Sequence, residues 1–250
     1  MKLTVNLGKN SYPIYIENNI LDKASSYISS CFSGKKIMII SDDNVFPLYG
    51  EKLKTSLGDY EVHELVLPHG EPTKAFETLP ALYNALLKQK FSRSDLVIAL
   101  GGGVIGDLAG FAASSYLRGI RFVQIPTSLL AQVDSSVGGK VAVDLPQGKN
   151  LVGAFYHPKL VLIDPQVLRT LPEHFIMDGM GEVIKYGCIW DRAFFDFLAA
   201  HPSRAEIMAE IEHVLYTCCD IKRQVVMADE RDTGLRMILN FGHTIGHAFE

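Results

Sequence analysis

Asp95-Leu-Val-Ile-Ala-Leu-Gly-Gly-Gly-Val-Ile-Gly-Asp-Leu-Ala-Gly110 is the stretch of sequence that decides the fold. Residues 96–100 are all apolar, which predicts a strand buried on both faces. Three glycines at 101–103 then leave a turn without side chains, and residues 104–113 have helix-compatible periodicity with small side chains. A strand, a glycine turn and a helix start together let backbone N–H groups contact a phosphate. The stretch therefore favours a phosphate or dinucleotide site over a glycine turn needed only for packing.

The glycines at 101, 103 and 106 match the pattern G-x-G-x-x-G, but the pattern alone is weak. The standard dinucleotide fingerprint also has an acidic residue about 20 positions further on, which binds the ribose. The sequence there is Gln124-Ile-Pro-Thr127, without an acid. Asp42, at the end of an earlier predicted strand, can take that role. We therefore predict a nucleotide site on a non-standard Rossmann-like topology.

The composition excludes several classes of protein. The chain has 250 residues, 48% of them hydrophobic and 21% charged, which is typical of soluble globular proteins. A net charge of −4 and the lack of a basic block predict no nucleic-acid partner. The N-terminus is not a signal peptide, and no apolar run is long enough to span a bilayer. The four cysteines lack metal or disulfide spacing, so we expect reduced thiols and a cytoplasmic location.

Strands and helices alternate over the first two thirds of the chain. Residues 1–20 alternate in hydrophobicity, as expected of two strands in a hairpin-like arrangement. Further strands are predicted at 35–43, 60–67, 96–100, 121–126 and 159–164, with helices at 21–31, 45–57 and 78–89. This order predicts a mostly parallel α/β sheet. Polar clusters at 42–44, 101–103 and 127–128 follow predicted strands, where ligands bind to such sheets.

The composition changes near Leu171-Pro172, and helices are predicted at 175–186, 192–200, 204–229 and 237–250. We therefore expect an α/β domain over residues 1–172 and an all-α domain over residues 173–250. The last predicted helix has no cap or stop signal, so we expect the native protein to continue beyond Glu250.

Two pairs of side chains in the helical part suit metal or acid–base chemistry. His243 and His247 are four residues apart and share one face of a helix, although two surface histidines are the alternative. Thr244 stands where a metalloprotease helix has glutamate, which excludes that class. Glu182 and Lys185 share a face in an otherwise apolar stretch. They form either a plain ion pair or, with an imidazole, part of a zinc site.

Lysines beside glycines point to an anionic ligand. Val133-Asp-Ser-Ser-Val-Gly-Gly-Lys140 and Lys149-Asn150 combine close backbone approach with positive charge, and Arg118 and Arg121 add two cations. A flexible surface loop with solvated lysines is the alternative. In a chain of negative net charge, these placements favour a phosphate or carboxylate ligand.

Together these motifs resemble the 3-dehydroquinate synthase family. The matching segments are Gly70-Glu71 with Lys74, Gly101-Gly-Gly-Val-Ile-Gly-Asp107, Pro126-Thr-Ser-Leu-Leu-Ala-Gln-Val-Asp-Ser-Ser-Val-Gly-Gly-Lys140, Gly148-Lys-Asn150, Gly181-Glu-Val-Ile-Lys-Tyr-Gly187, Ala228-Asp-Glu-Arg231 and Leu239-Asn-Phe-Gly-His-Thr-Ile-Gly-His247. They cover nearly the whole chain in the order of the family.

The resemblance implies an α/β NAD-binding domain followed by a helical metal- and substrate-binding domain. It implies a carbon–oxygen lyase of the shikimate pathway, dependent on NAD and on one divalent metal, zinc or cobalt. Such an enzyme converts 3-deoxy-D-arabino-heptulosonate 7-phosphate, a phosphorylated sugar acid, into 3-dehydroquinate and phosphate. The steps are oxidation by NAD, phosphate elimination, re-reduction and aldol closure. A homodimer is also implied.

The resemblance assigns roles residue by residue. NAD would be contacted by Asp42, Asn44, Glu71, Lys74, Gly102, Gly103, Val104, Ile105, Gly106, Asp107, Thr127, Ser128, Asp134, Lys149, Val167, Leu168, Arg169 and Thr170. The substrate would be held by Lys140, Asn150, Lys185, Lys222, Arg236, Asn240 and His247, with Arg118 reaching a phosphate across a dimer interface. Glu182 and His243 would bind the metal, and the third ligand of the family is a histidine downstream of Glu250.

The sequence departs from the family at His69, His174-Phe175 and Gly181, so a polar contact on the NAD side is in doubt at 173–175. Three other functions stay open. The first is a sister sugar-phosphate cyclase, the second a metal-dependent NAD polyol dehydrogenase, and the third a nucleotide-binding module without catalysis.

Overall fold

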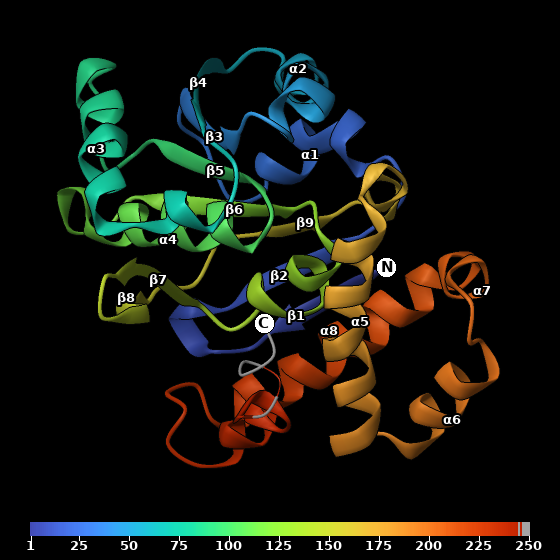
Figure 1. Ribbon diagram of the computed structural model, residues 1–250. Coiled ribbons are helices and arrows are strands. Elements are labelled where there is room, and N and C mark those ends of the chain that lie inside the picture. The colour runs from blue at the N-terminus through green and yellow to red at the C-terminus, as the bar shows by residue number, and fades with distance from the viewer. Residues whose placement is uncertain (245, 247–250) are drawn as a thin grey trace.

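The computed structural model describes residues 1–244 and 246, and its centre is a seven-stranded sheet (Figure 1). The strand order is β1 (Lys2–Val5), β2 (Tyr12–Ile16), β9 (Val161–Ile163), β6 (Arg121–Pro126), β5 (Leu96–Gly101), β3 (Lys36–Asp42) and β4 (Glu61–Leu67). Only β1 and β2 pair antiparallel within this sheet, and the other neighbours are parallel. The predicted α/β class and the predicted N-terminal hairpin are confirmed.

The chain changes direction across the sheet between β3 and β5. From β3 it moves outward to β4, and it then returns to the other side of β3 as β5 before continuing to β6. In parallel α/β sheets the crevice at such a switch point is where ligands bind. The glycine turn at 101–103 follows β5 at this crevice, so the fold places it where a ligand site is expected.

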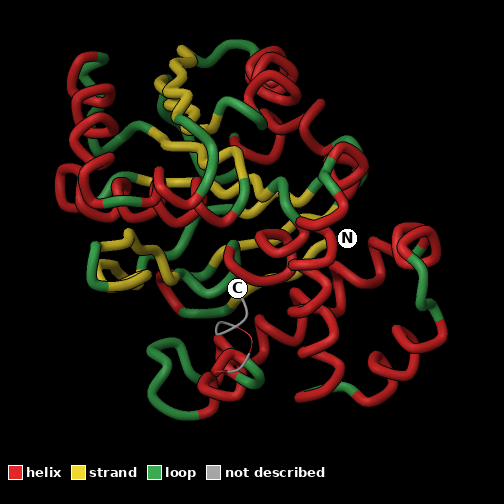
Figure 2. Tube along the Cα trace, in the orientation of Figure 1, coloured by secondary structure: helices red, strands yellow, loops and turns green. Residues whose placement is uncertain are grey.

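Helices cover both faces of the sheet (Figures 1 and 2). One face carries α1 (Ala24–Ile28) and α2 (Phe46–Leu57), and the other carries α3 (Leu79–Lys88) and α4 (Gly103–Ser115). Along β3, Ile37 and Ile39 pack into the first of these cores, whereas Met38 and Ile40 pack into the second. Alternate residues of the strand therefore feed opposite cores, which explains why the central strands are apolar at every position.

A separate two-stranded hairpin, β7 (Lys140–Leu145) and β8 (Gly148–Phe155), packs on α4 and was not predicted from the sequence. A methyl group added to Gly110 of α4 would lie 2.5 Å from Cγ1 of Val141, so glycine permits this close packing. The preceding residues Ala131–Ser135 form a π-helical turn. The polar segment around Lys140 is thus an ordered wall and not a loose surface loop.

The last part of the described chain is helical, with α5 (Glu173–Ile189), α6 (Arg192–Ala200), α7 (Arg204–Ala209) and α8 (Ile211–Ala228). Buried side chains of these helices form one hydrophobic core with Leu3, Val5 and Ile14 of the N-terminal hairpin. The division of the chain between residues 172 and 173 stays a prediction. None of the described helices is both long and apolar enough to cross a membrane.

Two predicted helices are wrong in extent. The helix predicted at 204–229 is interrupted because Glu210 leaves the helical conformation, with φ −104° and ψ 16°. In the helix predicted at 237–250, residues 237–240 belong instead to a 3₁₀ helix, Leu235–Asn240, and Gly242 has a non-helical φ of 83°. The Asp229 carboxylate accepts the backbone N–H groups of Thr233, Gly234 and Arg236, which fixes a tight turn in this region.

Candidate functional site

A cavity of about 990 Å³ lies between α4, the β7–β8 hairpin, α5, α8 and the C-terminal segment. Among the described residues, its wall combines cations, carboxylates, an amide and an imidazole from segments that are far apart in the sequence. These side chains are Asp107, Asp134, Lys140, Asn150, Asp178, Glu182, Lys185, Lys222, Arg236 and His243. The cavity therefore brings together most of the residues predicted to bind substrate and both predicted metal ligands.

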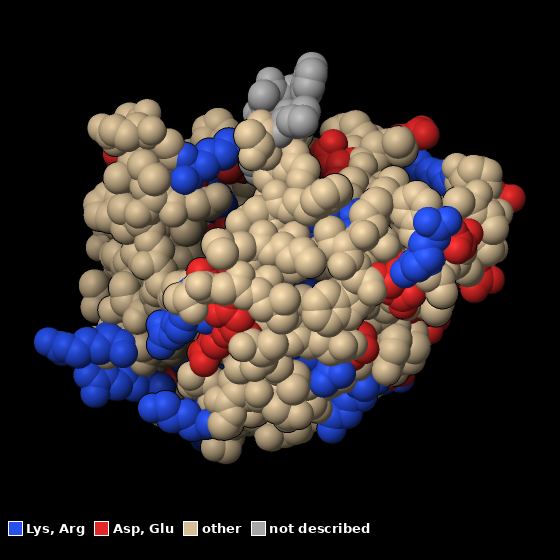
Figure 3. Space-filling view, turned by 90° about the horizontal axis from the view of Figure 1, so that it is seen from below, with Lys and Arg blue, Asp and Glu red and all other residues tan. Residues whose placement is uncertain are grey.

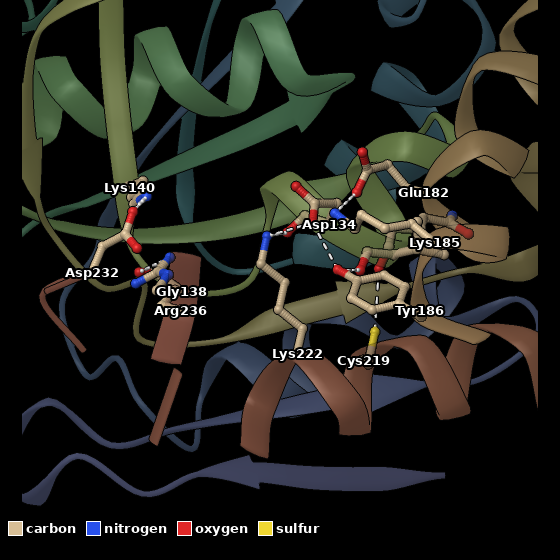
Figure 4. A network of polar contacts seen from close by, with 12 residues as sticks. Asp134, Gly138, Lys140, Glu182, Lys185, Tyr186, Cys219, Lys222, Asp232 and Arg236 are labelled. Carbon is tan, nitrogen blue, oxygen red and sulfur yellow. Dashed lines mark hydrogen bonds and ion pairs between the residues drawn. The ribbon is translucent and has the colours of Figure 1, made fainter. Parts of the chain in front are cut away.

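Asp134 is the hub of one group of polar contacts (Figure 4). Its carboxylate lies 2.8 Å from Nζ of Lys222 and accepts a 2.7 Å hydrogen bond from the hydroxyl of Tyr186. Burial favours the neutral acid, but Lys222 and then Lys185 outweigh it and hold the pKa of Asp134 well below its usual range. Burial likewise lowers the pKa of Lys222, opposed by Asp134. The carboxylate of Asp134 thus joins the π-helical turn to α8 by an ion pair and to α5 by a hydrogen bond.

Glu182 lies between a cation and an imidazole. One carboxylate oxygen is paired with Lys185, and the other lies 3.1 Å from Nε2 of His243. A carboxylate and an imidazole are ligands that zinc and cobalt accept, so the pair fits a divalent metal. No cluster of three metal-ligating side chains occurs among residues 1–244 and 246.

Arg236 is only 3% exposed, and its guanidinium is held by two backbone carbonyls. It donates to the carbonyl of Glu230 at 2.9 Å and to that of Gly138 at 3.1 Å. Lys140 is paired with Asp232 nearby, as Figure 4 shows. Two of the predicted substrate cations are therefore held by the turns that flank the cavity.

Asn150 lies at the mouth of the cavity in a left-handed conformation, with φ 59°. Its backbone N–H donates to the Asp144 carboxylate at 2.7 Å, across the turn of the β7–β8 hairpin. This hydrogen bond holds the strained residue in place.

Three predicted substrate residues are not brought together with these. Asn240 ends the 3₁₀ helix and is exposed outside the cavity wall. Arg118 is exposed at a left-handed bend after α4, with φ 64°, and it does not line the cavity. His247 lies outside the described residues.

The predicted NAD residues cluster at the carboxyl ends of the parallel strands. The Asp42 carboxylate accepts the N–H groups of Asn44 at 3.0 Å and Val45 at 2.9 Å, at the end of β3. Thr127, after β6, donates its N–H to the carbonyl of Gly101, the last residue of β5, at 2.9 Å. The last of these bonds joins the ends of β5 and β6 beside the glycine turn, and the first two fix the turn that follows β3.

The glycine turn itself fits a phosphate. No side chain caps the N-terminus of α4, so its first backbone N–H groups remain available to a ligand. A methyl group added to Gly102 would lie 3.4 Å from Oγ of Ser128, and one added to Gly103 would lie 3.3 Å from Oγ of Ser135. A side chain at either position would therefore fill the space between the N-terminus of α4 and these two serines.

The other predicted NAD residues are placed as follows. Val104, Ile105 and Gly106 form the first turns of α4, and only the backbone of the buried Ile105 and Gly106 can face a ligand. Val167, Leu168, Arg169 and Thr170 form a 3₁₀ turn after β9, which Tyr49 fixes by donating to the carbonyl of Val167 at 3.1 Å. Asn44, Glu71 and Lys149 are exposed.

Lys74 and Asp107 form a buried ion pair between the glycine-turn helix and the 3₁₀ turn Glu71–Lys74, with 2.7 Å between Nζ and Oδ2. Burial raises the pKa of Asp107 to about 6, although Lys74 acts in the opposite direction. Asp107 also lines the cavity, so it stands between the predicted cofactor and substrate sites.

This raised pKa predicts a pH dependence of stability. Between pH 3.8, the ordinary pKa of the group, and about pH 6, the native chain binds the Asp107 proton more tightly than the unfolded chain does. The contribution of Asp107 to the free energy of unfolding therefore falls as pH rises through this range. In Asp107→Asn we expect the slope of unfolding free energy against pH to become more positive by up to ~1.4 kcal/mol per pH unit in that range. Urea unfolding at pH 4, 5, 6 and 7 measures the slope, and equal slopes in both chains would contradict the prediction.

The sequence did not predict several residues that lie in or beside the site. Tyr186 is four positions after Glu182 on the same helix, a spacing that could have identified it. His157 and Asp232 carry no local signal, because packing alone brings them against Glu230 and Lys140, respectively.

The surface seen from below carries Lys, Arg, Asp and Glu side chains interspersed over much of its area, with some basic side chains gathered at one end (Figure 3). This mixture accords with a net charge of −4.

Comparison with known proteins decides the family. The model of the 3-dehydroquinate synthase N-terminal region matches residues 64–178, and that of the C-terminal region matches residues 179–250. The chain is 61% identical over 250 residues to a 3-dehydroquinate synthase of Clostridium beijerinckii, which covers 99% of this chain and 71% of that protein. The chain belongs to the 3-dehydroquinate synthase family.

Other members of this family are also similar over the whole chain. A 3-dehydroquinate synthase of Clostridium botulinum is 60% identical over 251 residues, covering 100% of this chain and 72% of that protein. The predicted resemblance to 3-dehydroquinate synthases is confirmed.

Solved structures of related cyclases share the fold. A 2-deoxy-scyllo-inosose synthase complexed with carbaglucose-6-phosphate, NAD⁺ and Co²⁺ has a TM-score of 0.88 at 29% identity, over 99% of this chain and 68% of that one. A Streptomyces hygroscopicus 2-epi-5-epi-valiolone synthase with NAD⁺ and Zn²⁺ bound has a TM-score of 0.88 at 30% identity, over 98% and 69%. Glycerol dehydrogenase of Sinorhizobium meliloti, at 16% identity and a TM-score of 0.62 over 84% and 62%, shares the fold alone.

Proposed function

We propose that the chain catalyses the 3-dehydroquinate synthase reaction, with NAD and one zinc or cobalt ion as cofactors. The substrate is 3-deoxy-D-arabino-heptulosonate 7-phosphate, and the products are 3-dehydroquinate and phosphate. The observation that carries the proposal is a single cavity in which four cations face a carboxylate–imidazole pair, next to a glycine turn at the sheet switch point. The identity to curated 3-dehydroquinate synthases over the whole chain supports the same reaction.

The cations suit a substrate with a carboxylate and a phosphate. Lys140, Lys185, Lys222 and Arg236 approach the cavity from four different segments, so they can contact two separated anionic groups. Lys185, Lys222 and Lys140 are each paired with a carboxylate of the chain, and Arg236 is held by carbonyls. A bound anion therefore meets ammonium groups whose positions are already fixed, which favours orientation of the substrate.

The NAD site would use the ends of β3, β5 and β6. Its residues would be Asp42, Asn44, Glu71, Lys74, Gly102, Gly103, Val104, Ile105, Gly106, Asp107, Thr127, Ser128, Asp134, Lys149 and the turn at 167–170. When bound, NAD supplies the acceptor for a hydride that returns within the same turnover. The chain contributes the N–H groups of the α4 N-terminus to the pyrophosphate and the Asp42 carboxylate, whose orientation two backbone N–H groups fix.

Glu182 and His243 would hold the divalent metal. When bound, the ion polarises substrate hydroxyls and favours their oxidation. Lys185 is paired with Oε2 of Glu182, whereas His243 contacts Oε1, so Lys185 fixes the orientation of that carboxylate.

We also propose a homodimer in which Arg118 serves the neighbouring subunit. The observation behind this is that Arg118 is exposed, lies outside the cavity of its own chain and is held at a left-handed bend between Leu117 and Gly119. An Arg118→Ala chain mixed with a chain inactivated at Glu182 should regain activity in mixed dimers.

A substrate panel tests the proposed reaction. The intact protein with NAD and zinc or cobalt is incubated with the heptulosonate phosphate, and phosphate release and absorbance at 340 nm are followed. We expect phosphate release without net NADH. Turnover of sedoheptulose 7-phosphate in place of the heptulosonate would support a sister cyclase, and accumulation of NADH from a polyol would support a dehydrogenase.

A further inference from the structure

His157 and Glu230 form a hydrogen-bonded contact that lies behind the cavity wall. His157 follows β8, Glu230 follows α8, and Nε2 of the imidazole lies 3.0 Å from Oε1 of the carboxylate. The histidine side chain is only 4% exposed, and neither residue lines the cavity. The proposed reaction leaves this pair without a role.

The same glutamate also holds Arg236. Its backbone carbonyl accepts Nη1 of Arg236 at 2.9 Å, while its side chain is held by His157. The second guanidinium nitrogen donates to the carbonyl of Gly138 at 3.1 Å. Through Glu230, the imidazole therefore fixes the carbonyl that aims one substrate cation.

The histidine ring also packs against the turn that precedes Lys140. A methyl group added to Gly139 would lie 2.5 Å from Nδ1 of His157, so the ring rests directly on this glycine. Gly138 and Gly139 have φ of 106° and 68°, a backbone conformation that the ring and its neighbours hold. The hydroxyl of Tyr12 accepts the N–H of Gly138 at 3.0 Å, which anchors the other side of the turn.

The chemistry of the ring suits a fixed contact. Nδ1 is buried without a hydrogen-bond partner among the described residues, so the proton of the neutral ring belongs on Nε2, which donates to Glu230. Burial lowers the pKa of His157, opposed by Glu230 and assisted by Arg236 and Arg231. The ring is therefore a neutral donor to a carboxylate at neutral pH.

We propose that His157 and Glu230 are positioning residues that set the spacing between Lys140 and Arg236. Two cations at a fixed spacing select a small sugar acid that carries two separated anionic groups, and they select against one that carries a single anion. The kinetic part of this inference rests on the proposed function.

Four variants and a matched control pair test it. His157→Ala and Glu230→Ala remove the contact, whereas His157→Gln and Glu230→Gln retain a donor and an acceptor at the same reach. His63 and Glu61 form a pair of the same kind, 2.9 Å from Nε2 to Oε1, on β4 and outside the cavity wall. His63→Ala and Glu61→Ala therefore control for loss of any histidine–glutamate pair.

We expect the alanine variants to raise KM for the heptulosonate phosphate about tenfold, with kcat and NAD affinity changed less than about threefold. The glutamine variants should restore KM to within about threefold of the parent, and the double alanine variant should be no worse than either single one. The control variants should leave KM unchanged. The proposal would be overturned if the alanine variants lost NAD affinity as much as they lost substrate affinity, or if the two alanine effects on KM added in the double variant. A similar rise of KM in the control variants would also overturn it.

A second readout does not depend on the reaction. Phenylglyoxal modifies accessible arginines, and peptide mass spectrometry reports the rate at Arg236, which is 3% exposed. We expect this rate to rise about fivefold in both alanine variants and not in the glutamine or control variants. If the parent releases no phosphate, the proposed function fails while this measurement still tests the positioning role, and an unchanged rate would refute it.

Discussion

Replacement of Glu182 by glutamine is expected to reduce kcat/KM for phosphate release by about 1,000-fold or more. The carboxylate lies between His243 and Lys185, and a neutral amide is a poor ligand for a divalent ion. Glutamine retains the volume of the side chain and an oxygen that can accept a hydrogen bond from Lys185, so the fold should survive. The loss should therefore come from the metal site.

The measurement combines phosphate release with metal content after equilibrium dialysis against zinc or cobalt. Glu173→Gln serves as the control, because Glu173 is an exposed carboxylate on the same helix α5 and does not line the cavity. We expect the control to retain both metal and activity. A Glu182→Gln variant that binds metal and turns over like the parent would remove Glu182 from the site.

The second large effect is expected on stability. Asp134→Ala should lower the free energy of unfolding by about 3 to 5 kcal/mol, because it leaves a buried ammonium without its partner. The Lys222 side chain is only 7% exposed, and the same carboxylate also accepts the hydroxyl of Tyr186. Removal of the Asp134 carboxylate thus leaves the Lys222 ammonium without its counter-charge at the junction of α5 and α8, although Lys222 keeps the backbone carbonyl of residue 134 and Tyr186 keeps that of Val133.

Urea unfolding followed by the fluorescence of Trp190, the only tryptophan in the chain, measures this loss. The double variant Asp134→Ala with Lys222→Met should recover more than about 1 kcal/mol, since no buried charge then remains unpaired. The exposed pair Arg192–Asp196 is the control, and Asp196→Ala should change stability by less than about 0.5 kcal/mol. If Asp134→Ala and Asp196→Ala lowered the free energy of unfolding equally, the Asp134 contact would contribute no more than a surface pair.

The main sheet could be predicted because β3, β5 and β9 contain consecutive apolar residues, whereas β1 and β2 alternate in burial. Asp42, Gly101 and Asp164 mark the ends of the three apolar strands. The β7–β8 hairpin could not be predicted, because Lys140, Asp144 and Lys149 interrupt its alternation and Gly138 and Gly139 suggest a loop. Val141 and Val143 alternate with less buried residues, and this is the signal that could have found it. The break at Glu210 has no glycine or proline to mark it, so periodicity alone predicts one continuous helix there.

Some contacts of the candidate site could likewise be predicted from the sequence, and others could not. Glu182 and Lys185 are neighbours on one helix, so their contact follows from sequence spacing. The approach of His243 to Glu182 and that of Lys222 to Asp134 depend on how α5, α8 and the C-terminal segment pack. For Arg236 and Lys222 only the family resemblance pointed to the substrate, since neither stands in a pattern that distinguishes it from a surface cation.

The hydrophobic core shared by the N-terminal hairpin and α8 has a consequence for synthesis of the chain. Arg223 of α8 donates to the carbonyl of Thr4 at 3.5 Å, across 219 positions of sequence. The ribosome therefore makes the apolar inner face of β1 and β2 about 10 to 40 s before it makes α8, at ordinary elongation rates. During that interval the nascent hairpin presents Val5 and Ile14 to solvent or to a chaperone, and contacts of this sequence separation close slowly.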